Sequence, residues 1–97
     1  SSAIAVNAQV SQGQAGGIVR GEHGLGLLFD LISQNEVIKS KDKIITSGLG
    51  GRFPPDLLIG EIGEIRSSSS ELFQKASVLP ATNLRNLRVV FVVKKSR

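Results

Sequence analysis

The chain has 97 residues, 21% of them charged and 40% hydrophobic, proportions typical of one folded domain with one core. It contains no cysteine, which excludes disulfides, thiolate-bound metals and a thiol nucleophile. Twelve Lys and Arg against eight Asp and Glu give a net charge of +4, enough to raise the question of an anionic partner. Half of these cations lie in the last four residues or around Asp42: Lys94, Lys95, Arg97, Lys39, Lys41 and Lys43. A solvated tail and loop therefore explain most of the excess.

The sequence contains no apolar run that approaches the roughly 20 residues needed to span a bilayer, and no signal peptide opens it. It begins with Ser1 rather than Met, directly before a strand-like apolar run at positions 3–6. We therefore expect residues 1–97 to be a single domain excised from a longer protein.

Hydrophobic periodicity predicts short strands through the first half of the chain. Apolar side chains occupy every second position from 4 to 10, which predicts a half-buried strand over 3–10. Gly16 and Gly17 mark a turn before a short strand over 18–20. A second alternation predicts a strand over 25–32, with Leu27, Phe29 and Leu31 on the same face.

The second half continues in the same way after a polar, lysine-rich loop over 33–43. Strands are predicted over 43–47 and 57–66, the latter with a bulge or bend because Gly60 and Gly63 disfavour a helix. A serine run over 67–70 predicts an exposed loop, and a strand follows over 72–79 with Phe73 or Val78 facing inward according to its register.

The end of the chain predicts one more strand. A single turn over 81–86, capped by Thr82 or Asn83, leads to a β-branched strand over 87–93 that is apolar on both faces. Seven short β segments with glycine at the turns predict an all-β fold, a small closed or partly open antiparallel β-barrel of about six to seven strands.

The connection from Lys43 to Gly60 is the least generic stretch. It joins two apolar runs through three glycines, two prolines and Phe53, which predicts a stiff, shaped loop rather than a minimal hairpin. Phe53 is the expected anchor, either packing the loop onto the core or presenting it to a partner.

The sequence gives only weak support for a catalytic or metal-binding function. A serine hydrolase could use Ser47 with His23 and Asp30 or Asp42, but an exposed loop histidine, a turn residue and a strand end explain them more simply. One histidine and scattered carboxylates predict no metal site, and we expect no cofactor.

Binding of phosphate or nucleic acid is also disfavoured. Gly48-Leu49-Gly50-Gly51 resembles a phosphate-binding nest, but no predicted helix follows it. A nucleic-acid-binding barrel remains an alternative, although four phenylalanines, with no Tyr or Trp, offer few stacking platforms. No nucleic acid is expected as a partner.

Residues 42–54, Asp-Lys-Ile-Ile-Thr-Ser-Gly-Leu-Gly-Gly-Arg-Phe-Pro, followed by Leu57 and Ile59-Gly60-Glu61-Ile62, resemble the signature of the rod shape-determining protein MreC family. The flanking runs at 4–6, 17–21 and 79–84 agree, so the resemblance covers nearly the whole chain. The loop residues that carry it are Thr46, Ser47, Gly48, Leu49, Gly50, Gly51, Phe53, Pro54 and Gly60.

Three positions depart from the family pattern. The family commonly has glycine where this chain has Lys41 and Asp56, and proline where it has Leu58. Because Asp tolerates left-handed backbone geometry better than most residues, we expect the loop to keep its shape.

The resemblance implies a C-terminal β-barrel of a single-pass protein, on the outer side of the bacterial cytoplasmic membrane. It implies a non-catalytic scaffold of the rod elongation machinery, which organises peptidoglycan synthesis. Implied partners are class B penicillin-binding proteins, MreD, RodZ and the MreB filament system, together with self-association. Small six-stranded barrels also build trypsin-like enzymes, which keeps a hydrolase as an alternative.

A partner surface is predicted at Arg52-Phe53-Pro54-Pro55, where an arginine lies beside an aromatic residue and two prolines. The equally weighted alternative is that Phe53 closes one end of the barrel as part of the core.

Overall fold

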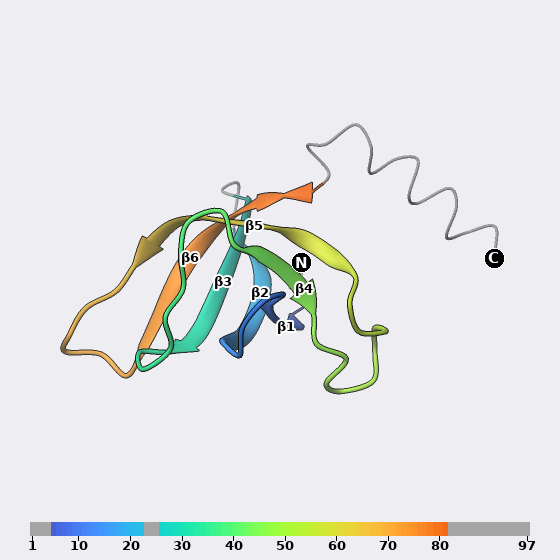
Figure 1. Ribbon diagram of the computed structural model, residues 1–97, viewed down its shortest axis with the longest axis horizontal. Helices are drawn as coiled ribbons and strands as arrows, with labels where there is room; N and C mark the ends of the chain where they lie inside the picture. Colours follow the sequence, from blue (N-terminus) through green and yellow to red (C-terminus); the bar gives the residue numbers. More distant parts are fainter. Residues whose placement is uncertain (1–4, 23–25, 82–97) are drawn as a thin grey trace.

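The computed structural model describes residues 5–22 and 26–81, which form an antiparallel barrel (Figure 1). Its strands are β1 (Val6–Val10), β2 (Gly16–Glu22), β3 (Gly26–Ser33), β4 (Lys43–Thr46), β5 (Leu58–Arg66) and β6 (Phe73–Pro80). They follow the order β1-β2-β3-β6-β5-β4, and pairing of β1 with β4 closes the ring. The predicted all-β closed barrel is confirmed. The predicted strand over 87–93 lies outside the described residues, as do His23 and the two candidate caps of the predicted turn, Thr82 and Asn83.

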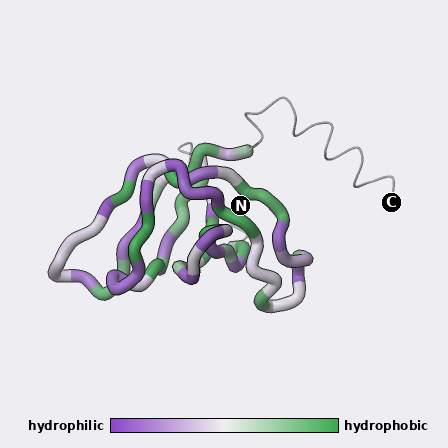
Figure 2. Tube along the Cα trace, viewed as in Figure 1, coloured by the Kyte–Doolittle hydropathy of each residue, from purple (hydrophilic) through white to green (hydrophobic). Residues whose placement is uncertain are grey.

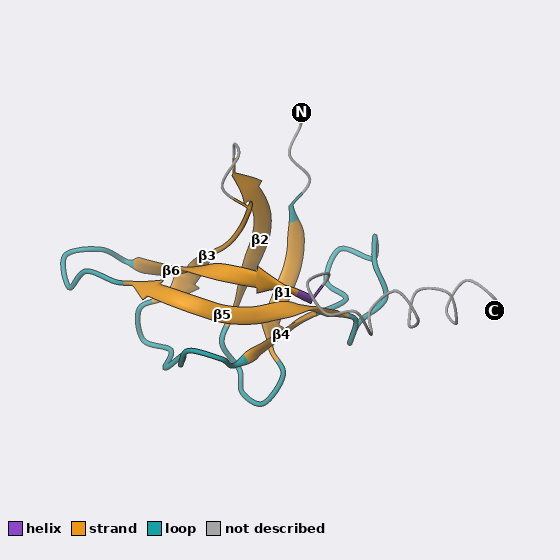
Figure 3. Cartoon of the chain, turned by 90° about the horizontal axis from the view of Figure 1, so that it is seen from above, coloured by secondary structure: helices purple, strands orange, loops and turns teal. Residues whose placement is uncertain are grey.

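A compact aliphatic core fills the ring. Phe29, Ile32, Ile44 and Ile62 are the largest fully buried side chains. Smaller residues from three of the strands pack against them: Ala8, Val10, Val19, Ala76 and Val78. Because this core is made by strands that are far apart in sequence, the barrel folds through non-local contacts. Figure 3 shows how the strongly coiled strands wrap around this interior.

Strand β3 departs from the predicted alternation. Its pairing with β6 shifts register between Phe29 and Ile32, and Leu31 takes a left-handed φ of 60°. This bulge turns Leu31 outward, where it is 48% exposed, while Phe29 and Ile32 both face the core. The prediction that Leu31 shares a face with Phe29 is therefore wrong.

Strand β5 bends at the glycines that the sequence marks. Its register shifts against β4 beside Gly60, and against β6 between Ile62 and Ile65, a stretch that contains Gly63. A Cβ on Gly60 would lie 2.2 Å from the carbonyl oxygen of Leu79, so only glycine lets β5 approach β6 this closely. The predicted bulges are confirmed.

The register of β6 decides which of its side chains face the core. Gln74, Ala76 and Val78 point inward and are buried, whereas Phe73 points outward and is 47% exposed. Within the described ranges, no helix is long or apolar enough to cross a membrane.

Candidate functional site

The loop between β4 and β5, residues 47–57, is tied to the barrel through Thr46. The Thr46 hydroxyl donates to the carbonyl of Pro54 (2.6 Å) and accepts from the amide of Leu57 (2.9 Å). Its backbone amide donates to the Leu57 carbonyl (2.9 Å), and its carbonyl accepts from the Asp56 amide (2.9 Å). Thr46 is only 4% exposed, so these bonds are shielded from water and hold the returning arm of the loop in one place.

The glycine-rich arm forms a tight turn that lies against β1. Gly48, Gly50 and Gly51 all have positive φ, and the Gly51 amide donates to the Gly48 carbonyl (3.2 Å). The Asn7 side-chain amide donates to the carbonyl of Leu49 (3.2 Å), which anchors the turn to the barrel. The glycines therefore allow the backbone conformation that the turn requires.

This loop and the first residue of β5 expose a largely apolar surface, which we call the loop surface: Leu49, Arg52, Phe53, Pro54, Pro55 and Leu58. Phe53 is 38% exposed and is not among the buried core residues, so part of its ring is open to solvent. Figure 2 shows green, hydrophobic positions in this connection as well as in the strands. The structure thus brings Arg52, Phe53, Pro54 and Pro55 together on one solvent-facing loop.

Two of the positions that depart from the family pattern have left-handed backbones. Asp56 has φ 70° and Lys41 has φ 78°, a conformation that favours glycine. The Asp56 amide donates to the Thr46 carbonyl, so this residue takes part in fixing the loop. The Lys41 amide likewise donates to the carbonyl of Ile62 (2.7 Å), which fixes the loop before β4.

The residues considered for a hydrolase are engaged in separate local contacts. The Ser47 hydroxyl accepts from the amide of Leu49 (3.2 Å), and the Asp42 carboxylate accepts from the amide of Lys39 (3.0 Å). Asp30 pairs with Arg20 across β2 and β3 (2.8 Å). The structure brings none of these three together into a nucleophile and acid arrangement.

The Arg20–Asp30 pair also supports the bulge in β3. Although burial acts to raise the pKa of Asp30, hydrogen bonds from Arg20 and from the Leu31 amide outweigh it and hold that pKa below its ordinary value. The Leu31 amide lies 2.8 Å from the Asp30 carboxylate, so the same side chain stabilises the left-handed Leu31. Sequence reasoning treated Asp30 only as a possible catalytic acid and missed this role.

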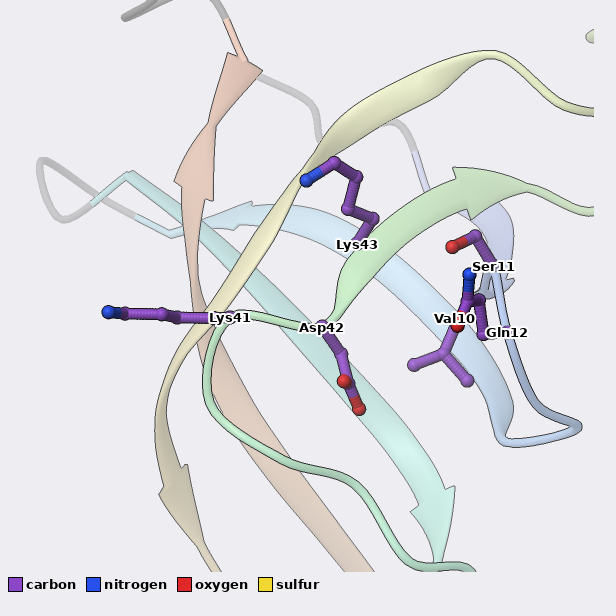
Figure 4. Close-up of a pocket in the computed structure, with 6 residues that line it drawn as sticks. All are labelled: Val10, Ser11, Gln12, Lys41, Asp42 and Lys43. Atoms are coloured by element: carbon purple, nitrogen blue, oxygen red, sulfur yellow. The ribbon is translucent and has the colours of Figure 1, made fainter.

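A surface cavity of about 270 Å³ lies where the end of β1 meets the start of β4 (Figure 4). It is lined by Val10, Ser11, Gln12, Lys41, Asp42 and Lys43. Lys41 extends away from the other side chains, and the Lys43 ammonium lies 3.6 Å from the Glu61 carboxylate on β5. Of the charged side chains that line it, Lys43 thus bridges β4 to β5, and the Asp42 carboxylate accepts from the Lys39 amide. Across residues 5–22 and 26–81, no three His, Asp or Glu side chains cluster as metal ligands.

The charge of the barrel itself is close to zero. Residues 5–22 and 26–81 carry seven Lys and Arg against eight Asp and Glu, a net charge of −1. The other five cations all lie within 82–97: Arg85, Arg88, Lys94, Lys95 and Arg97. The described barrel therefore lacks the excess of positive charge that nucleic-acid binding would use.

Together, the closed ring and its ordered apolar loop define a small antiparallel β-barrel domain. The sequence model for "Rod shape-determining protein MreC, barrel core" matches residues 1–94. The chain belongs to the MreC family.

Curated relatives agree with this assignment. The cell shape-determining protein MreC of Listeria monocytogenes is 35% identical over 82 residues, which are 82% of this chain and 28% of the relative. The protein of the same name from Bacillus subtilis is 47% identical over 58 residues, which are 60% of this chain and 20% of the relative. The chain thus spans between a fifth and somewhat more than a quarter of the length of these relatives.

Two solved structures share the fold. A chain in the complex between penicillin-binding protein PBP2 and MreC from Helicobacter pylori superposes with a TM-score of 0.70 at 25% identity, covering 77% of this chain and 46% of that one. MreC of Listeria monocytogenes superposes with a TM-score of 0.70 at 31% identity, covering 79% of this chain and 38% of that one.

Proposed function

We propose that this barrel is a non-catalytic interaction module of the bacterial rod elongation complex, and that it organises peptidoglycan synthesis through protein contacts. The family assignment and the names of the curated relatives support a role in cell shape. The solved complex of a related MreC with a penicillin-binding protein supports a partner of that class. The observation that carries the proposal is the rigid, solvent-facing loop surface.

The proposed contact is made by Arg52, Phe53, Pro54 and Pro55. Phe53 offers an aromatic anchor, and Arg52 can donate to polar groups around it. Because Thr46 already fixes the loop, the entropy of ordering it is not lost again on binding. A buried aromatic anchor on a preformed loop is how a small interface reaches useful affinity.

The remaining elements of the proposal concern the whole protein. The barrel would be the C-terminal domain of a longer single-pass protein, and would lie on the outer side of the cytoplasmic membrane. MreD, RodZ and the MreB system would be further partners, and copies of the protein would self-associate. These relations follow from the family and not from any single residue described above.

The test replaces Phe53 by glutamine and measures binding to a purified class B penicillin-binding protein of the same organism by isothermal titration calorimetry. Loss of a buried aromatic anchor should weaken binding by about tenfold or more. The melting temperature should stay unchanged, because Phe53 lies outside the core.

Val37→Gln is the matched control, since Val37 is a strongly exposed apolar residue in another loop. It should leave the affinity as it is. Equal affinity of Phe53→Gln and the unaltered chain would contradict the proposed contact. A large drop in the melting temperature of Phe53→Gln would instead indicate that Phe53 stabilises the fold.

A further inference from the structure

A second apolar surface lies at the start of β6. Leu31 is 48% exposed, Leu72 is 81% exposed and Phe73 is 47% exposed. The bulge in β3 places Leu31 between the pairs Phe29 with Ala76 and Ile32 with Gln74, and so beside Lys75 on the outer face. In Figures 1 and 3 the connection between β5 and β6 lies at the opposite end of the barrel from the loop between β4 and β5.

Two cations flank this apolar surface. Arg66 on β5 and Lys75 on β6 are directly opposite partners in the antiparallel ladder. Like charges in this arrangement repel each other, which costs stability unless an anion lies between them. The Arg66 guanidinium pairs with the Glu64 carboxylate at 3.9 Å, and because these side chains are 63% and 73% exposed the pair is weak. Lys75 makes no ion pair among the described residues, although its charge helps to lower the pKa of Asp30. Neither cation is held in a strong ion pair, so both can interact with a further carboxylate.

A cavity of about 200 Å³ joins the cations to the aromatic ring. It is lined by Arg66, Ser67, Ser68, Glu71, Phe73 and Lys75. A space of this size accepts one or two side chains and not a whole organic ligand. Glu71 also lines it, so one part of the cavity repels a second negative charge.

The serine-rich wall of the cavity is ordered by its own hydrogen bonds. The Gln34 amide donates to the Leu72 carbonyl (3.0 Å), and the Gln34 side chain donates to the Ser68 carbonyl. The Glu71 amide also donates to the Ser68 carbonyl (3.0 Å), and the hydroxyls of Ser68 and Ser70 lie 2.9 Å apart. The run over 67–70 is exposed, as the sequence predicts, and hydrogen bonds to the chain after β3 hold it as a turn.

Gln74 fixes the segment that follows β3. Its side-chain amide is buried and donates to the carbonyls of Ser33 (3.0 Å) and Glu36 (2.8 Å). A buried amide with two backbone acceptors leaves the turn after β3 little freedom. The cavity therefore exists before any ligand arrives, which lowers the entropic cost of binding.

We propose that Leu31, Arg66, Leu72, Phe73 and Lys75, the β6 surface, bind a segment of a second protein that carries one carboxylate beside an apolar side chain. The carboxylate accepts from Arg66 and Lys75 and relieves their mutual repulsion. The apolar side chain packs on Phe73 and Leu31. Glu71 disfavours a run of acids, and the net charge of −1 on the described barrel disfavours polyanions such as nucleic acid or a lipid surface.

The consequence for the proposed function is that the barrel holds two partners at once. The loop surface and the β6 surface lie at opposite ends, so occupation of one does not obstruct the other. This consequence rests on the proposed function, whereas the β6 surface stands on its own contacts.

The test is an NMR titration of the ¹⁵N-labelled 97-residue chain with two capped peptides, acetyl-Ala-Leu-Glu-Phe-Ala-amide and the same peptide with Gln in place of Glu. Shifts should concentrate on the amides of residues 66–75. Loss of the carboxylate should weaken binding by about fivefold, as expected for one partly exposed ion pair. Lys75→Gln should reduce the affinity for the Glu peptide by a similar factor, and Phe73→Ser should remove binding of both peptides.

Lys39→Gln and Phe53→Gln are the control variants, and both should bind the Glu peptide as the unaltered chain does. The second control separates this proposal from the proposed contact of the loop surface. The proposal is overturned if the two peptides bind with equal affinity or if the shifts are confined to residues 47–57. It is also overturned if no amide shifts at a peptide concentration of about 1 mM, which corresponds to a weak dissociation constant. A stronger shift of the same amides by a thymidine oligonucleotide would overturn it in favour of a polyanion site.

Discussion

The Thr46 hydroxyl shows how one side chain fixes the surface that the family signature builds. Replacing Thr46 by valine keeps the shape of the side chain but leaves the Leu57 amide and the Pro54 carbonyl without this partner. Because the site is buried, we expect a loss of about 1–3 kcal/mol in the free energy of unfolding. Urea denaturation measures it. Thr46→Ser keeps the hydroxyl and should recover most of the loss, and equal stability of the two variants would contradict this role.

A second prediction concerns Lys41, which has φ 78° where the family commonly has glycine. An L-residue in this conformation costs about 1–2 kcal/mol, and the greater freedom of glycine in the unfolded chain offsets part of the gain from removing that strain. Lys41→Gly should therefore raise the free energy of unfolding by about 0.5–1 kcal/mol. Lys39→Gly, two residues earlier and without a positive φ, should lower it. The prediction is wrong if both variants are destabilised.

The sequence predicts that the loop is stiff, but not which hydrogen bonds hold it. The glycines and prolines of the loop indicate a stiff connection, and the resemblance to a family identifies the loop as part of a signature. The role of Thr46 depends on where the carbonyl of Pro54 comes to lie, eight residues later. No local pattern encodes that position. The exposure of Phe53 was also undecided from the sequence, because an aromatic residue between glycines and prolines fits either a core or a surface.

Among the elements, β5 and β3 differ in how far the sequence predicts their bulges. Glycines mark the bends in β5, and both register shifts occur beside them. The bulge in β3 has no glycine or proline within it, and Leu31 there fits the apolar alternation. Its left-handed backbone is supported by a hydrogen bond that the Leu31 amide donates to the carboxylate of the preceding Asp30. A bulge of this kind is visible only once the pairing with β6 is known.

The close approach of β5 to β6 gives a prediction at the scale of the element. A Cβ at position 60 would lie 2.2 Å from the Leu79 carbonyl oxygen, a backbone atom that cannot move without disturbing the ladder. Gly60→Ala should therefore destabilise the barrel by about 1–3 kcal/mol, as overpacking of an interior does. Gly21→Ala is the control, since a Cβ there meets no atom within 4 Å and its φ is not positive. If thermal denaturation gives the two variants equal melting temperatures, the close approach is not the reason for this glycine.

For the whole molecule, the six described strands close the ring by themselves. The same part of the chain has a net charge of −1, although the full sequence has +4. The excess of positive charge in the full sequence thus comes from residues outside the described ranges. That separation could be anticipated in part, since three of the cations lie in the last four residues.

This separation predicts the effect of truncating the chain after Asn83. Because β1 to β6 pair completely without the remaining residues, the shortened chain should keep a β-type circular dichroism spectrum and a cooperative thermal transition. Weak, salt-sensitive binding of the full chain to an oligonucleotide should disappear with the five cations. A full-length variant with Arg85, Arg88, Lys94, Lys95 and Arg97 changed to glutamine separates charge from chain length. Oligonucleotide binding that survives both changes would place a polyanion site on the barrel and would contradict a module that works through protein contacts alone.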